Sequence, residues 1–131
     1  MRTLKSFLFI SLLACAALTG CRSKPKPEWK PLRTVLVGPW ISEDGSQLVI
    51  KMTGNYTLTT GDGTVYQGKV ERGSDMLNFS IRNDPFDCGN LGGIYHFDVD
   101  ETSGAEELTL TVEDDTCSDR RKLFGKTWLR P

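Results

Sequence analysis

Hydrophobic and polar residues alternate along most of the chain after residue 34, which is the pattern of β-strands that bury one face. In the stretch MLNFSIR, for example, Leu77, Phe79 and Ile81 alternate with polar side chains. Dipeptides that suit tight hairpin turns separate the alternating runs; they are Asp44-Gly45, Gly54-Asn55 and Asp62-Gly63. No segment shows the period of a helix, so the pattern predicts an all-β domain.

The alternation predicts eight strands, at residues 34–42, 46–52, 55–60, 64–71, 76–82, 93–99, 107–113 and 121–130. Short connections make neighbouring strands antiparallel, and eight such strands can close into a small up-and-down barrel without exposed edges. A two-sheet β-sandwich is the alternative. The side chains expected inside, which are enough to fill a barrel of this size, are Leu48, Ile50, Met52, Tyr56, Leu58, Tyr66, Val70, Leu77, Phe79, Ile81, Tyr95, Phe97, Val99, Leu108, Leu110 and Val112.

An apolar run at residues 7–18 follows Arg2 and Lys5 near the start of the chain. This run is shorter than the ~20 residues that a membrane-spanning helix needs, so it fits a signal peptide better. The stretch LTGC at residues 18–21 resembles the lipobox of bacterial lipoproteins. The resemblance implies that residues 1–20 are removed and that Cys21 becomes a lipidated N-terminus. An ordinary secretory signal with a chance cysteine is the alternative.

Residues 21–33 form a basic, proline-rich stretch before the domain at residues 34–131. Prolines favour an extended chain, so we interpret the stretch as a tether whose charges favour anionic headgroups; a merely solvated linker is the alternative. Arg22, rather than Asp, follows the cysteine. By resemblance to Gram-negative lipoproteins, this implies sorting to the outer membrane, with the domain facing the periplasm.

The charges are nearly balanced overall, with 16 Lys and Arg against 17 Asp and Glu. The tether is basic and the domain acidic, however, and phosphate affinity needs basic side chains on the binding face. The composition therefore argues against a nucleic-acid-binding protein. We expect a monomer that is held at the membrane by its lipid.

Two cysteines remain for the domain if Cys15 leaves with the leader and Cys21 carries the lipid. Cys88 lies in the connection after the fifth predicted strand, and Cys117 lies in the connection after the seventh. In an up-and-down barrel these connections share one end, and disulfides form in oxidising compartments. The sequence therefore predicts a Cys88–Cys117 disulfide at this rim.

Gly38-Pro39-Trp40 matches the G-x-W pattern of lipocalins. Further matches to bacterial lipocalin-like domains follow in order, namely Cys88, Gly89, Tyr95, Phe97, Asp115, Cys117, Arg120 and Trp128. Residues 36–131 thus resemble a short lipocalin-like (calycin) barrel. The resemblance implies that Trp40 plugs the closed end of the barrel and that Arg130 packs across it as a cation–π partner.

The sequence has few residues suited to catalysis. His96 is the only histidine, and it faces outward because its neighbours Tyr95 and Phe97 face inward. The glycine-rich stretch GDGTVYQG has strands on both sides and no helix to form a phosphate site. The turns contain acidic residues but lack the Asp-x-Asp-x-Asp-Gly register of a calcium loop. We therefore predict no enzyme, metal or cofactor.

The connections at the disulfide rim are rich in acidic residues. The candidate binding residues there are Asp84, Phe86, Asp87, Asp114 and Asp115. One hypothesis is a lipocalin-like module that binds a small apolar or amphipathic ligand. The other is an interaction or inhibitor module whose acidic rim docks on a basic envelope protein. Phe86 is either an exposed contact or a cap that folds back on the core.

Overall fold

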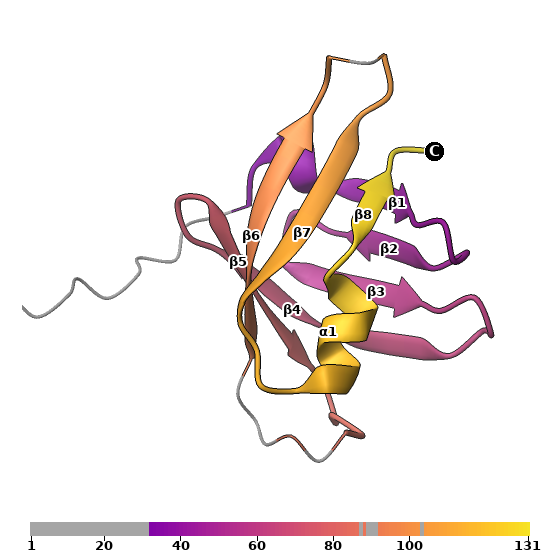
Figure 1. The fold of residues 1–131 in the computed structure, drawn as a ribbon, viewed down its shortest axis with the longest axis vertical. Helices are drawn as coiled ribbons and strands as arrows, with labels where there is room; N and C mark the ends of the chain where they lie inside the picture. The colour runs from indigo at the N-terminus through magenta and orange to yellow at the C-terminus, as the bar shows by residue number, and fades with distance from the viewer. Residues whose placement is uncertain (1–31, 87, 89–91, 103) are drawn as a thin grey trace, which may run out of the picture.

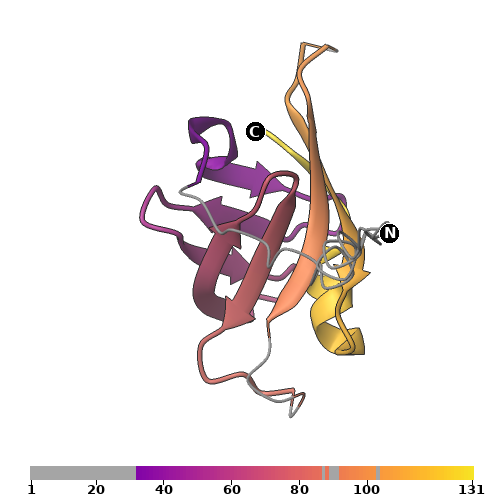
Figure 2. The same cartoon turned by 90° about the vertical axis from the view of Figure 1, so that its left-hand side faces the viewer.

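The fold is a closed barrel of eight antiparallel strands, each paired with the next in the chain and the last with the first (Figures 1 and 2). It comes from a computed structural model, which describes residues 32–86, 88, 92–102 and 104–131. The predicted all-β up-and-down barrel is confirmed, and the sandwich alternative is wrong. The signal peptide, Cys21 and nearly all of the tether lie outside the described residues, so they stay predictions.

The strands are β1 (Gly38–Ile41), β2 (Gln47–Ile50), β3 (Asn55–Thr59), β4 (Val65–Arg72), β5 (Met76–Ile81), β6 (Gly93–Asp100), β7 (Glu107–Asp114) and β8 (Thr127–Leu129). A 3₁₀ turn, η2 (Thr34–Leu36), precedes β1, and a short helix, α1 (Ser118–Phe124), lies between β7 and β8. The β6–β7 hairpin projects beyond the rest of the barrel (Figure 1).

Aromatic side chains fill the barrel interior. Phe79 and Phe124 stack with ring centroids 4.4 Å apart, and Tyr56 meets both rings edge-on at 5.5 Å. Tyr95 also packs edge-on against Phe79, at 5.8 Å. Around these rings lie the other buried hydrophobic side chains, namely Leu36, Trp40, Leu48, Ile50, Leu58, Val70, Leu77, Leu108, Leu110 and Trp128. The packing leaves the barrel centre occupied by the protein's own side chains.

The predicted strand at 121–130 is wrong over its first half, where the chain forms α1. Arg120 and Phe124 are buried and lie four residues apart, so they share the face of α1 that packs on the barrel. The helix has only seven residues, and a single buried pair is too short a pattern to show a helical period. Phe124 thereby joins α1 to the aromatic core, where its ring packs against those of Tyr56, Phe79 and Tyr95.

The predicted strand at 34–42 is also wrong at its start, where the chain makes the turn η2. The Trp40 Nε1–H donates to the Leu36 carbonyl oxygen at 3.0 Å, which folds the segment back on itself. Gly38 follows the turn with φ +113°, a conformation that other residues rarely adopt.

Two expected core residues lie on the surface instead. Met52 is 57% exposed because it belongs to the turn between β2 and β3. Val112 is 38% exposed and lies where the β6–β7 register shifts, between Ile94 and Tyr95. Val112 lies directly opposite the buried Tyr95, so it keeps the inward face, and its exposure comes at the last regular pair before the shift.

Candidate functional site

The disulfide joins Cys88, in the β5–β6 connection, to Cys117, in the β7–α1 connection, with the Cα atoms 5.6 Å apart. The predicted pairing is therefore confirmed. The bond closes a segment with a sequence separation of 29 residues at the end of the barrel that also carries α1. We call this end the disulfide rim.

Replacing Cys88 and Cys117 together with serine should lower the free energy of unfolding by about 3 to 4 kcal/mol, because an open chain regains the entropy that the bridge removes. Urea unfolding of the oxidised protein and the double variant measures the loss. Reductant should weaken the native protein and leave the serine variant unchanged. Equal stability of the native protein with and without reductant would contradict the prediction.

A buried ionic cluster lies next to the disulfide. Arg120 donates to both oxygens of Asp115, from Nη2 at 2.7 Å and from Nε at 2.9 Å. Tyr95 donates its hydroxyl to Asp115, and the Cys117 backbone N–H donates to the same carboxylate at 2.9 Å. Gly93 makes room for the cluster, because a Cβ there would lie 2.2 Å from Asp115 Oδ2. The cluster satisfies both buried charges.

Burial raises the energy of the Asp115 carboxylate, but its hydrogen bonds from Arg120, Tyr95 and the Cys117 backbone outweigh that cost and hold its pKa below the ordinary value. The Arg120 Nη1 also lies 3.4 Å from Asp84 Oδ2. The Asp115 side chain is fully buried and that of Asp84 is 11% exposed. This corrects the expectation that Asp84 and Asp115 belong to an acidic docking surface, since both carboxylates face Arg120.

The other candidate rim residues are distributed differently. Asp114 is exposed, and Asp87 lies outside the described residues. Phe86 is half-buried, with its ring centroid 5.6 Å from that of Tyr66. Its backbone N–H donates to Asp84 Oδ1 at 2.8 Å, which fixes the loop beside Arg120. Phe86 thus folds back against Tyr66 and is not a fully exposed contact.

The seam where β1 pairs with β8 has a single residue pair, Ile41 with Leu129. Side-chain contacts of Arg130 add further links between the two ends of the barrel sheet. The Arg130 guanidinium donates to the carbonyl oxygens of Val35, Val37 and Pro39, at 2.7, 3.0 and 3.2 Å respectively. The Arg130 Cζ also lies 3.8 Å from the centroid of the Trp40 ring, in the cation–π arrangement that the lipocalin resemblance implies.

The G-x-W motif has a local explanation at this seam. A Cβ on Gly38 would lie 3.0 Å from Arg130 Nη1, and the positive φ of this residue adds strain for any other side chain. Trp40, two residues later, is fully buried under the guanidinium. Trp128 is fully buried as well and donates its Nε1–H to the Phe124 carbonyl oxygen at 3.3 Å. These motif residues therefore have structural contacts.

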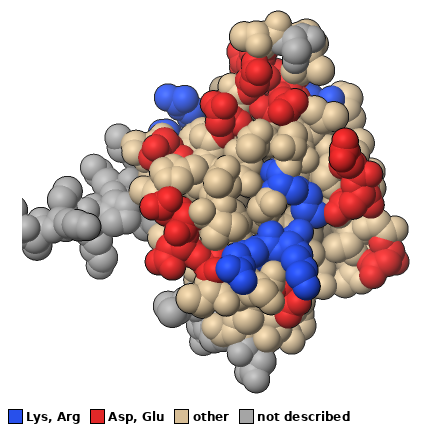
Figure 3. Space-filling view, in the orientation of Figure 1, with Lys and Arg blue, Asp and Glu red and all other residues tan. Residues whose placement is uncertain are grey.

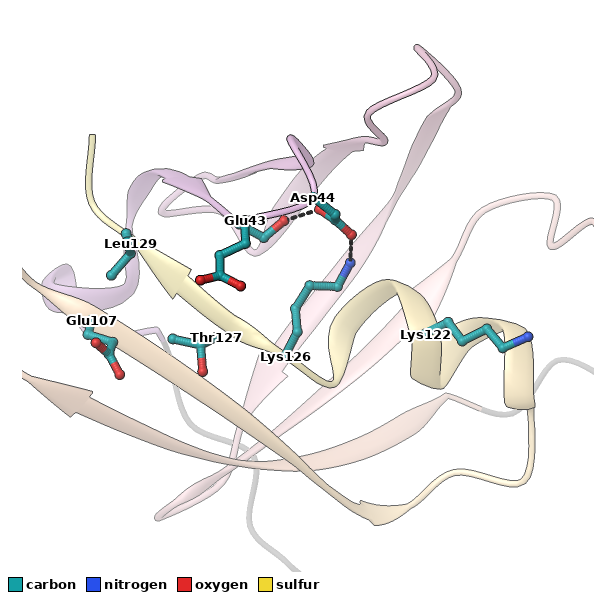
Figure 4. A pocket seen from close by; sticks show the side chains of 8 residues that line it. Glu43, Asp44, Glu107, Lys122, Lys126, Thr127 and Leu129 are labelled. Atoms are coloured by element: carbon teal, nitrogen blue, oxygen red, sulfur yellow. Dashed lines mark hydrogen bonds and ion pairs between the residues drawn. The ribbon is translucent and has the colours of Figure 1, made fainter.

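A groove of about 620 Å³ lies between the turn that follows β1 and the strand β8. Its residues, which define the seam groove, are Ser42, Glu43, Asp44, Glu107, Lys122, Lys126, Thr127 and Leu129 (Figure 4). Lys126 reaches across to Asp44, with Nζ 2.6 Å from Oδ2, and this contact holds the Asp44 pKa well below its ordinary value. Among the described residues, Glu43 and Lys122 have no ion-pair partner. The seam groove thus offers unpaired charges of both signs.

Basic side chains gather over α1 and the start of β8, with acidic side chains on both sides (Figure 3). Arg121 and Lys122 lie in the last turn of the helix, and Lys126 follows it. The sequence interpretation missed this arrangement because it assigned these residues to a strand. A strand would have pointed neighbouring side chains to opposite faces, whereas a helix can place them together.

The structure gives no catalytic constellation for His96. Its ring lies between Asp75 and Glu113, at 3.4 and 2.8 Å, and the side chain is 43% exposed on the outer face of β6. No group of three His, Cys, Asp or Glu side chains in the described part of the chain could hold a metal ion. Within the same residues, no helix has the length and hydropathy to cross a membrane.

Searches against protein-family models, curated proteins and solved structures find no match for this chain. The fold and the site therefore define a class by architecture, that of small closed up-and-down β-barrels. Within that class, this barrel has an interior packed with side chains, one rim closed by a disulfide and a short helix, and grooves on its outer surface.

Proposed function

We propose that the protein is a lipid-anchored, non-catalytic binding protein of the bacterial cell envelope that holds a small amphipathic ligand on the outside of its barrel. The filled interior carries this proposal, because the rings of Phe79 and Phe124 stack where a lipocalin-like carrier would hold its ligand. The lipobox-like LTGC stretch and the basic tether support attachment to the outer membrane, with the domain facing the periplasm.

The charged seam groove favours a second candidate, a protein partner. The unpaired Glu43 and Lys122 would suit a partner segment with charges of both signs. The basic surface of α1 would widen such an interface (Figure 3). On this second candidate function, the partner docks beside β8 and not on an acidic rim, so it need not be a basic protein.

Native mass spectrometry tests the proposal, using protein secreted to the periplasm with Cys21→Ser so that no lipid is attached. We expect an adduct of lipid-like mass that leaves under gentle activation while the charge-state distribution stays that of a folded protein. A ligand held inside the barrel would leave only on unfolding, and that result would contradict external binding. Mass spectrometry of the membrane-bound native protein should find Cys21 acylated, and an unmodified Cys21 would contradict the anchor.

A further inference from the structure

Two adjoining hollows lie along the outer face of β4 and share Gln67 and Arg82. The larger has a volume of about 610 Å³ and is lined by Thr64, Val65, Tyr66, Gln67, Arg82, Asn83 and Pro85. The smaller has a volume of about 170 Å³ and is lined by Lys51, Asn55, Tyr56, Thr57, Gln67, Gly68 and Arg82. We call the two together the β4 groove.

The smaller end of the β4 groove is cationic. The Lys51 backbone N–H bonds to the Asn55 carbonyl oxygen at 2.9 Å, and the Arg82 N–H bonds to the Gln67 carbonyl oxygen at 2.7 Å. These bonds fix both backbones at the hollow, while among the described residues neither basic side chain has an ion-pair or hydrogen-bond partner. No carboxylate lines this end. Its charges are free to bind an anion.

Gly68 also lines this end, and it is buried between β3 and β5. A Cβ there would lie 1.9 Å from the Ser80 carbonyl oxygen, so the close approach of β4 and β5 requires glycine. The amide side chain of Gln67 lines the wall and adds N–H donors beside the two cations. An anion at this end can therefore contact the Lys51, Gln67 and Arg82 side chains together.

The larger end is the more apolar of the two, and it lies beside the connection between β5 and β6. Val65 is 56% exposed on the outer face of β4, although it is a large hydrophobic residue. Pro85 lines the opposite side, and the ring of Tyr66 packs on Phe86 at 5.6 Å. The disulfide at Cys88 holds the same connection. Val65 and Pro85 thus give this end an exposed apolar surface beside a loop that the disulfide holds in place.

We propose that the β4 groove binds an anionic amphiphile, a single apolar chain with a phosphate or carboxylate head. The head lies between Lys51 and Arg82, and the chain lies over Val65. Combined volumes of this size suit a small ligand. This inference rests on the proposed function and names the ligand class.

Charge distinguishes the β4 groove from two other grooves on the described part of the chain. Carboxylates of Glu43, Asp44 and Glu107 line the seam groove. A further hollow, between β6 and the turn before β5, has Asp75 and Glu101 in its lining. Those carboxylates would repel an anion, whereas both ends of the β4 groove lack them.

The test is a ¹H–¹⁵N NMR titration of the Cys21→Ser protein with decyl phosphate below its micelle concentration. We expect saturable shifts at the amides of Gln67 and Gly68, and the same amides should respond more weakly to inorganic phosphate. The neutral detergent octyl glucoside should shift residues near Val65 alone. Equal shifts around Gly68 with the neutral detergent would overturn the proposal.

Exposed-residue variants assign the two ends. Lys51→Gln with Arg82→Gln should weaken decyl phosphate binding by about tenfold or more, since two charge-assisted contacts are lost. Val65→Thr should weaken it by about threefold through lost apolar contact. The matched controls are Lys69→Gln, an exposed lysine on β4 outside the groove lining, and Val49→Thr, an exposed valine on β2, and neither should change the affinity. Equal affinity in all variants would overturn the site.

Two further outcomes separate the possible failures. Shifts confined to interior residues such as Leu77 and Phe79 would mean that the ligand enters the barrel, which contradicts external binding and the proposed function with it. Binding at the seam groove instead would overturn only the β4 site. Vesicles that contain anionic phospholipid should sediment the native protein and the Arg82→Gln variant to the same extent. If the variant sediments less than the native protein, and decyl phosphate does not bind, the groove recognises a membrane surface rather than a free amphiphile, and the proposal fails.

Discussion

Replacing Arg120 with methionine is expected to destabilise the barrel by about 3 to 5 kcal/mol, one of the two largest effects we predict for a single side chain. The Arg120 side chain is 2% exposed, and its guanidinium holds Asp115, whose side chain is fully buried. Methionine fills much of the same volume but leaves the Asp115 carboxylate without its counter-ion. Urea unfolding followed by tryptophan fluorescence measures the loss.

Two variants show whether the buried charge is the cause. Arg121→Met changes the exposed arginine next in the helix and should alter the stability by less than about 0.5 kcal/mol. Adding Asp115→Asn to Arg120→Met should recover part of the loss, because asparagine carries no charge and still accepts from Tyr95 and the Cys117 N–H. A double variant less stable than Arg120→Met would contradict this explanation.

The same cluster predicts how stability depends on pH. The pKa of Asp115 lies below its ordinary value of 3.8 in the folded protein. Its contribution is therefore fully present above about pH 4 and is lost as the pH falls through the folded pKa. The Arg120→Met, Asp115→Asn variant lacks this titration, so its stability should fall less steeply than that of the native protein in this acid range. Parallel acid profiles would contradict the assignment.

The barrel could be predicted from the sequence because its evidence is local and repeated. Alternation in runs such as 76–82, together with turn dipeptides, predicts strands, and short connections leave few topologies. The disulfide then followed from topology, since Cys88 and Cys117 lie in connections at the same end. These inferences depend on many residues that agree, so single errors such as Met52 do not change them.

The chemistry of the rim could not be predicted in the same way. Asp84, Asp115 and Arg120 look like surface charges in the sequence, because nothing local distinguishes a buried carboxylate from an exposed one. Their burial depends on α1, a helix too short to show a period, which brings Arg120 under the disulfide connection. The β4 groove was missed for a related reason, because Lys51 and Arg82 line one hollow only once the four strands β2 to β5 have paired.

The second large effect is expected at the seam. Arg130→Met should cost about 2 to 4 kcal/mol of folding stability, because methionine keeps the alkyl contact with Trp40 and loses every polar contact of the guanidinium. Those contacts reach three carbonyl oxygens and Glu106, whose Oε2 lies 2.9 Å from Nε. Urea unfolding measures the cost, and Lys122→Met serves as the control for loss of an exposed cation.

Hydrogen exchange locates the effect of Arg130. The backbone joins β1 to β8 through one residue pair, so without the guanidinium the carbonyl oxygens of Val35, Val37 and Pro39 lose their partner at the seam. We expect amides of η2 and β1 to lose protection while those of the β6–β7 hairpin keep theirs. Arg130→Lys should restore little, since an ammonium cannot bridge three acceptors and stack on the indole. Uniform loss of protection would show that Arg130 does not act on the β1–β8 seam in particular. Full rescue by lysine would show that the side chain contributes only its charge. Either result would contradict a role of the guanidinium in closing the barrel.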